Sequence, residues 1–249
     1  MILLFYAFGL ELRPFRRRLE HRSALGLDGL KGFRSRIGNL ELVAIATGIG
    51  PRRAAKIAQR AFQALPHASL VITAGVAGAL SPGLAVGDVV VADRLIVAAA
   101  EGLGPERVLT VAPERVEELS AILLEAGLAV STGGLLTIGR VLATGADKRQ
   151  AREASGAIAV DMESASIAAE AASEGLPLVC LRTVMDAADE EVVAAGFTDA
   201  QGHVNALRTM RTIATEPGTI LRLPRMMYNL SIAAHSLADA LDAIIHAAT

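Results

Sequence analysis

The sequence contains few of the residues on which redox and metal-cluster chemistry depend. Among its 249 residues are one cysteine, Cys180, and no tryptophan. A lone cysteine excludes an internal disulfide and a metal cluster held by cysteines. Because Cys180 lies inside the apolar segment 176–184, we expect it to be a buried structural thiol.

An excess of positive charge is also missing, and only 3% of the residues are aromatic. The formal net charge of −2 gives no reason to expect nucleic acid as a partner, and so few rings cannot build base-stacking platforms. The five histidines lack the close spacing of metal ligands, so we expect no metal ion. The Gly-x-Ser-x-Gly motif of serine hydrolases, the dinucleotide fingerprint and the phosphate loop are absent as well.

Long hydrophobic runs do not occur either. Although 52% of the residues are hydrophobic, no uninterrupted apolar run approaches the roughly 20 residues that a membrane-spanning helix needs. The apolar residues 1–7 lack the basic leader and cleavage site of a signal peptide, and we interpret them as a first strand. These features predict a soluble, cytoplasmic protein.

Short β-rich segments alternate with helical patterns along the chain. This alternation predicts a single α/β domain over residues 1–249, with a mixed, mostly parallel twisted sheet between two layers of helices. The length suits one such domain. The expected strands cover residues 2–7, 42–46, 70–73, 88–91, 135–138, 157–160 and 178–184, and the expected helices cover residues 52–65, 113–126, 148–154 and 164–174.

Residues 205–249 form a helical C-terminal extension in this prediction. Three helical patterns are separated near residues 216–218 and 223–224, and the last covers residues 231–247. The extension either covers the sheet or, through Arg222, Arg225 and the apolar residues between them, forms a lid over an apolar substrate or a peripheral contact with a membrane.

Acidic residues and glycine-bearing turns follow several of the expected strands. The turns cover residues 47–50, 73–78 and 137–140, and the acids include Glu11, Asp161, Glu163 and Asp186. Ligands of parallel α/β sheets bind at the carboxyl ends of the strands, so we expect these acids to share one cleft. Grouped carboxyl groups suit the cleavage of glycosidic bonds. Acids in these positions can equally begin a helix, and position alone leaves both interpretations open for Asp161 and Glu163.

Four segments, in this order, resemble motifs of the nucleoside phosphorylase and nucleosidase superfamily, especially its methylthioadenosine and S-adenosylhomocysteine nucleosidases. The resemblance spans the chain from residue 1 to about residue 190. The segments are ATGIGPRRAA (46–55), VITAGVAGALSPGLAVGDVVVAD (71–93), AVDMESASIAAEA (159–171) and LRTVMDAAD (181–189).

This resemblance implies a role for each acid. Asp186 matches the acid that donates a proton toward purine N7, and Glu11 falls where the family keeps the glutamate that orients the attacking water. Glu163 matches the carboxylate that binds the ribose 2′ and 3′ hydroxyls, with Met162 on the sugar face. On its own, Met162 would be interpreted as a core residue.

The resemblance also implies the rest of the substrate site and the partners. It implies no cofactor, with inorganic phosphate as a co-substrate only for a phosphorolytic enzyme, and a homodimer or higher homo-oligomer. The further substrate-binding residues are Gly48, Ile49, Gly75, Val76, Ala77, Gly78, Asp161, Leu142 and Ala143.

Some residues depart from the nucleosidase pattern. Val76 stands where these enzymes have a serine, and Leu142 where they stack a phenylalanine on the base. Segment 73–78 contains no arginine that could bind phosphate, which favours hydrolysis. Arg52, Arg53 and Arg140 could still supply cations near the cleft.

Segment 139–168 and the extended tail resemble a subgroup, the hopanoid-associated phosphorylase-type proteins. That resemblance implies the release of adenine from adenosylhopane. The alternatives are a phosphorolytic nucleoside phosphorylase, a methylthioadenosine/S-adenosylhomocysteine nucleosidase and a noncatalytic module that binds nucleosides or lipids.

Overall fold

A computed structural model describes residues 1–99, 102–192 and 218–247 of the chain. The helices are α1 (Gly9–Arg18), α2 (Pro51–Ala64), α3 (Pro113–Glu125), α4 (Gly145–Ser155), α5 (Ser164–Ser173) and α7 (Gly218–Ala247). The strands are β1 (Ile2–Tyr6), β2 (Arg22–Ala24), β3 (Lys31–Ile37), β4 (Leu40–Ala46), β5 (Leu70–Ala79), β6 (Val89–Ala98), β7 (Pro105–Thr110), β8 (Val130–Thr137), β9 (Ala159–Asp161) and β10 (Leu178–Asp186).

Strand β1 shows why the sheet needs helices on both faces. All five of its residues are buried and apolar, as expected for a strand covered on both sides. Alternate side chains enter different cores, since Leu3 and Phe5 pack in one cluster whereas Leu4 and Tyr6 pack in the other. Strands β4 and β5 pair with β1 in parallel on either side.

The strands form one mixed sheet that curls back on itself. Strand β10 pairs with both β5 and β6, so that β5, β10, β6, β8 and β9 close into a ring, while β1, β4, β3 and β2 extend outward from β5. Of the ten strand pairings in the described part of the chain, five are parallel and five antiparallel. The predicted α/β class with a mixed sheet is confirmed, although antiparallel pairing is more frequent than we expected.

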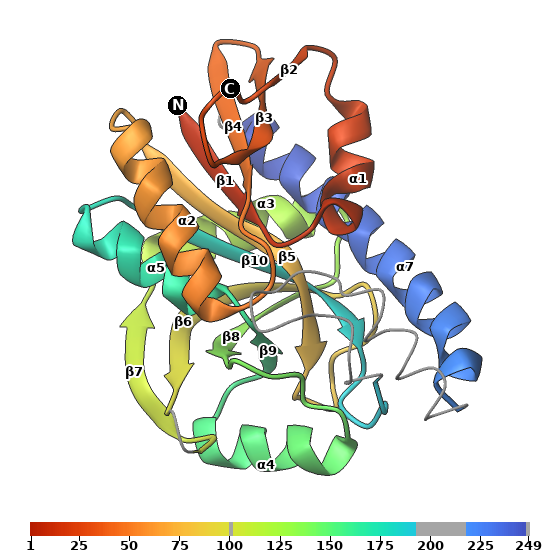
Figure 1. The fold of residues 1–249 in the computed structure, drawn as a ribbon. Coiled ribbons are helices and arrows are strands. Elements are labelled where there is room, and N and C mark those ends of the chain that lie inside the picture. Colours follow the sequence, from red (N-terminus) through yellow and green to blue (C-terminus); the bar gives the residue numbers. More distant parts are fainter. Residues whose placement is uncertain (100–101, 193–217, 248–249) are drawn as a thin grey trace.

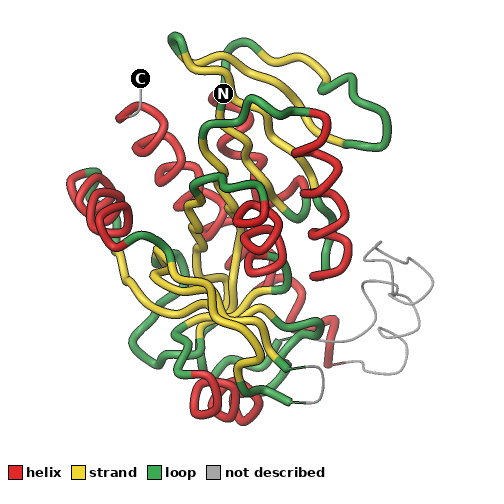
Figure 2. The backbone as a smooth tube through the Cα atoms, turned by 90° about the vertical axis from the view of Figure 1, so that its left-hand side faces the viewer, coloured by secondary structure: helices red, strands yellow, loops and turns green. Residues whose placement is uncertain are grey.

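Helices cover both faces of this sheet. Helices α1 and α7 pack against each other on one face, and α2 packs against α5 on the other (Figure 1). A view turned by 90° shows the strands running through the middle with helices around them (Figure 2). Helix α4 lies beyond the ends of β8 and β9, next to the region where β10 ends (Figure 1).

Several elements differ from the sequence-based expectation. Residues 73–78, expected as a glycine turn, lie inside β5, because a buried strand can hold glycine where other groups approach its backbone closely. The sequence did not predict helix α1, because its last three residues are arginines and Pro14 inside it is a helix-breaking signal. The edge strand β7 was also missed, because its exposed, charged residues show no apolar alternation.

The C-terminal helix differs most from the sequence-based prediction. Helix α7 continues through Pro224, where we had expected a break between two helices. The described tail covers the sheet, since its apolar face packs on α1, α3 and β10. The rest of the predicted extension, residues 205–217, lies outside the described residues. No described helix is long and apolar enough to cross a membrane.

The burial of α7 predicts a large stability effect inside this helix. Leu237 is 0% exposed and belongs to the core beneath the sheet. We expect Leu237→Ala to lower the free energy of unfolding by about 2–5 kcal/mol, because the substitution leaves a cavity. Met227→Ala, at a position that is 48% exposed on the same helix, should change it by less than about 0.5 kcal/mol. Urea unfolding measures both values, and equal effects would contradict this packing.

Candidate active site

A cavity of about 160 Å³ lies where β5, β9 and β10 end, next to the start of α1. The three acids that the sequence predicted to meet, Glu11, Glu163 and Asp186, all line it, and each is buried. The other lining residues are Ala7, Phe8, Ile49, Val76, Ala77, Gly78, Arg140, Val141, Leu142, Lys148, Val160, Asp161, Met162, Met185 and Val192.

Glu11 lies in the first turn of α1, and backbone amides hold its carboxyl group. The amides of Ala7 and Phe8 donate to Oε1 at 2.5 and 3.1 Å, and the amide of Val76 donates to Oε2 at 3.1 Å. Burial raises the pKa of Glu11, while the nearby Arg182 guanidinium and these amides act in the opposite direction. A Cβ on Gly75 would lie 2.8 Å from Glu11 Oε2, so a larger residue here would displace the carboxyl group.

Glu163 directly precedes α5 and accepts a hydrogen bond from the Gly50 amide at 2.7 Å. The turn that supplies this amide depends on glycine, because Gly48 and Gly50 have φ values of 73° and 107°. Burial, and then the negative charge of Asp161, raise the pKa of Glu163 to about 8. A buried carboxyl group with one protein donor has oxygen lone pairs left for a ligand.

Asp161 was expected to bind substrate, but protein donors occupy its carboxylate. Thr137 Oγ1 donates to Oδ1 at 2.7 Å, and the Ser164 amide and Arg182 Nε donate to Oδ2 at 3.0 and 2.9 Å. Arg182 also donates to Thr73 Oγ1, and its side chain is 3% exposed. Asp161 is therefore the counter-ion of a buried arginine. Sequence reasoning did not single out Arg182, although a cation inside an apolar strand requires such a partner.

Asp186 ends β10 beside a buried lysine. Lys148 Nζ donates to Asp186 Oδ2 at 2.5 Å, and the lysine side chain is 1% exposed. Burial raises the pKa of Asp186, and the positive charge of Lys148 counteracts part of this effect. A Cβ on Gly78, which pairs with Asp186 in the sheet, would lie 2.8 Å from Oδ2. The sequence offered one signal for Lys148, its spacing of three residues from the apolar Ala151 on the buried face of α4.

The remaining predicted residues divide into two groups. Ile49, Val76, Ala77, Leu142 and Met162 form apolar walls of the cavity. Gly48, Gly75 and Ala143 do not line the cavity. Gly48 and Gly75 contribute through the shape of the backbone, and the Ala143 carbonyl accepts a hydrogen bond from the Val192 amide.

Of the three arginines that the sequence analysis named as possible cations near the cleft, one lines the cavity. Arg140 lines the cavity, whereas Arg53 donates to the Thr47 carbonyl and Arg52 is exposed beside a different hollow. Within residues 1–99, 102–192 and 218–247, no group of three or more His, Cys, Asp or Glu side chains could hold a metal ion.

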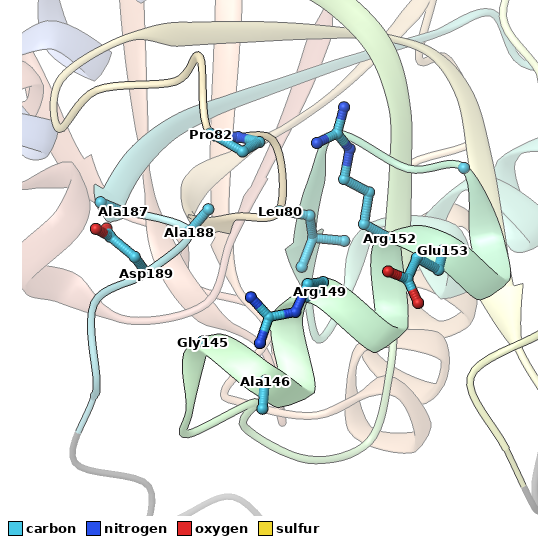
Figure 3. Close-up of a pocket in the computed structure, with 11 residues that line it drawn as sticks. Leu80, Pro82, Gly145, Ala146, Arg149, Arg152, Glu153, Ala187, Ala188 and Asp189 are labelled. Carbon is cyan, nitrogen blue, oxygen red and sulfur yellow. The ribbon is translucent and has the colours of Figure 1, made fainter.

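A second hollow lies between α4 and the loop that follows Asp186. Arg149, Arg152 and Glu153 project from α4 along one side of it, and residues 187–189 form the other side (Figure 3). None of the three clustered acids lines this hollow. The chemistry of the carboxyl groups therefore belongs to the smaller cavity.

Comparisons with known proteins identify the family of this chain and test its predicted fold. The family model described as "Phosphorylase superfamily" matches residues 2–214. The chain belongs to the phosphorylase superfamily. This finding confirms the superfamily that the sequence motifs predicted.

One curated relative matches part of the chain. A futalosine hydrolase of Acidothermus cellulolyticus is 36% identical over an alignment of 132 residues, and the match covers 47% of this chain and 53% of that protein. The match thus spans about half the length of this curated relative.

Solved structures show the same fold. The 5′-methylthioadenosine/S-adenosylhomocysteine nucleosidase of Neisseria meningitidis, in complex with methylthio-immucillin-A, superposes with a TM-score of 0.76 at 20% identity, covering 99% of this chain and 98% of that chain. A futalosine hydrolase mutant of Helicobacter pylori superposes with a TM-score of 0.75 at 18% identity, covering 98% of each chain. The predicted fold class is thereby confirmed.

The raised pKa of Glu163 predicts a pH-dependent stability. Between its ordinary value of 4.5 and about 8, the folded protein keeps a proton that the unfolded chain releases, so the free energy of unfolding should fall as the pH rises through this range. Glu163→Gln cannot ionise, and its amide oxygen can still accept from Gly50. We expect this variant to be more stable than the native protein at pH 8 by on the order of 2 kcal/mol.

Urea unfolding of the ligand-free proteins at pH 5 and pH 8 measures this difference. Glu174→Gln, at an exposed position, is the matched control and should follow the native protein at both pH values. A Glu163→Gln variant with the native pH dependence would contradict the assigned environment of Glu163.

Proposed function

We propose that this protein is a purine nucleosidase, which hydrolyses the bond between the base and the ribose of a nucleoside. The observation that carries the proposal is the meeting of three buried acids, from α1, the start of α5 and the end of β10, around one cavity. Two carboxyl groups in separate environments can act as acid and base in glycosidic cleavage.

In the proposed reaction, Asp186 donates its proton to purine N7. The electrons of the C1′–N9 bond then move into the base, which leaves as a neutral purine, and positive charge develops on the ribose ring. Burial raises the pKa of Asp186, which favours the protonated form that an acid catalyst needs.

Glu11 and Glu163 complete this mechanism. Glu11 orients a water molecule toward C1′ and accepts a proton from it as the C–O bond forms. Glu163 accepts hydrogen bonds from the ribose hydroxyls through the lone pairs that Gly50 leaves unused, and Met162 packs on the sugar. These contacts would place the ring between the acid and the water.

The surroundings of Glu11 favour water over phosphate as the nucleophile. Its carboxyl group already accepts from the amides of Ala7, Phe8 and Val76. A phosphate bound beside these amides would compete for them and would lie next to a carboxylate. Hydrolysis avoids both costs.

For the substrate, we propose an adenine nucleoside whose 5′ substituent is apolar, with adenosylhopane as the specific candidate. The resemblance of segment 139–168 to hopanoid-associated proteins supports this choice. Val76 places an apolar side chain in the cavity wall where the nucleosidase pattern has a serine, and Leu142 keeps the wall apolar where that pattern has a phenylalanine. The relative named futalosine hydrolase makes futalosine the comparison substrate.

The acid assignment predicts a large kinetic effect at one position. Asp186→Asn should lower kcat by roughly 10²- to 10⁴-fold, because the amide cannot donate the proton that the leaving base requires. Asp189→Asn is the matched control, since Asp189 lies in the same loop but faces the neighbouring hollow (Figure 3). It should keep native kcat. Ultraviolet assays of base release measure both variants, and equal activities would remove Asp186 from the mechanism.

Product analysis distinguishes hydrolysis from phosphorolysis. The substrates are methylthioadenosine, S-adenosylhomocysteine, inosine, futalosine and adenosylhopane, each with and without inorganic phosphate. We expect a free sugar as the product, at a rate independent of phosphate, and adenosylhopane as the best substrate. A phosphate-dependent sugar 1-phosphate would identify a phosphorylase. If no base is released from any compound, the protein is a noncatalytic binding module.

A further inference from the structure

Lys148 is a buried cation whose hydrogen-bonding capacity is fully used. Its ammonium donates to Asp186 Oδ2, to the Ala187 carbonyl at 2.6 Å and to the Glu190 carbonyl at 3.0 Å. A protonated lysine has three N–H donors, so these three acceptors occupy all of them. Lys148 therefore has no donor left for a ligand, although its side chain lines the cavity.

Lys148 lies in the first turn of α4, and hydrogen bonds at the start of the helix hold this turn in place. Thr144 and Asp147 form a capping box, in which Thr144 Oγ1 accepts from the Asp147 amide at 3.1 Å and the Asp147 carboxylate accepts from Thr144. Lys148 follows directly, and Ala151 buries the same face of the helix one turn later. The position of the ammonium is thus set by helix geometry.

The loop after Asp186 is held from its other side as well. The Ala187 amide donates to Glu190 Oε2 at 3.3 Å, and Arg225 Nε of α7 contacts Glu190 Oε1 at 2.8 Å. Asn229 of α7 donates to the same carboxylate. Lys148 contacts both Asp186 and the carbonyls of this loop, whose side chain at Glu190 is held by α7.

We propose that Lys148 is the positioning residue of the acid: it fixes Asp186 Oδ2, leaves the second carboxyl oxygen to the nucleoside, and stabilises the carboxylate that remains after the proton has moved. This inference rests on the proposed function. The proton travels from the carboxyl group of Asp186 to purine N7, and the ammonium of Lys148 keeps all three of its protons. A cation beside the new carboxylate lowers the free energy of that charge-separated state.

The electrostatics of Asp186 support this role. Burial and the charge of Glu190 raise the pKa of the carboxyl group, whereas Lys148 lowers it. Lys148 faces Asp186 from α4 and Glu190 faces it from the loop, while Arg225 of α7 is paired with Glu190. Removal of the lysine charge leaves two influences that raise the pKa and none of comparable size that lowers it, so Asp186 would stay protonated to higher pH.

The test is Lys148→Met, which keeps an unbranched side chain one atom shorter but removes the charge and the donors. We expect kcat to fall roughly 10- to 100-fold while KM changes by less than about threefold, because the acid is displaced but the ribose contacts remain. The alkaline limb of the pH profile of kcat should move to higher pH. Arg149→Met is the matched control, since it removes the same charge from the exposed side of α4 (Figure 3). This control should keep native kcat and the native profile.

A second variant separates positioning from simple structural support. Lys148→Ala opens a space that can be reached from the cavity, so added ethylammonium or propylammonium should restore part of kcat in a saturable way, whereas propanol of similar size should not. Thermal melting checks that each variant is folded. If Lys148→Met does not fold, Lys148→Arg takes its place. Because this variant keeps the charge, the alkaline limb should stay at its native pH while kcat falls.

Two results would overturn the inference. One is a Lys148→Met protein with native kcat and the native alkaline limb, even if its melting temperature is lower. The other is a Lys148→Ala protein that ammonium ions do not rescue. These failures are distinct from failure of the proposed function, which would appear as a native protein that releases no base from methylthioadenosine or any other nucleoside tested.

Discussion

The cost of burying carboxyl groups is the constraint on which the rest of this site depends. Each buried acid that lines the cavity loses its hydration, and protein donors compensate to different extents. Asp161 is fully engaged by Arg182 and its neighbours, whereas Glu163 has one amide and Asp186 one ammonium. Among the described residues, Glu163 and Asp186 each have one carboxyl oxygen without a protein donor, and both acids line the cavity, so a ligand can supply the missing bonds there.

The fold supplies this arrangement through backbone rather than through side chains alone. Gly75 and Gly78 lie in β5 because a Cβ at either position would come within 2.8 Å of a carboxyl oxygen of Glu11 or Asp186. The Gly48–Gly50 turn delivers the amide that Glu163 accepts. Residues far apart in the sequence therefore converge for two reasons. Strands β1, β5 and β10 run parallel with β9 paired to the end of β5, and glycine lets the backbone approach the acids.

The sequence predicted seven of the ten described strands, the acids and their common cleft, because apolar runs and acids after strands are local patterns. It did not distinguish Asp161 from Glu163, since adjacent acids look alike until the position of Arg182 is known. Lys148 was missed for a similar reason, because its partner Asp186 lies 38 residues away and only the fold brings them together. Helix α7 was not predicted to pass through Pro224, because a proline inside a helical pattern is a local signal for a break.

The most direct test of this account is a crystal structure with a purine nucleoside analogue whose base and sugar are joined by a C–C bond, so that it cannot be cleaved. The account predicts the base edge with N7 against Asp186, the ribose hydroxyls on Glu163 and a water between Glu11 and C1′. An analogue bound in the hollow lined by Arg149 and Arg152, with none of the three acids in contact, would contradict it.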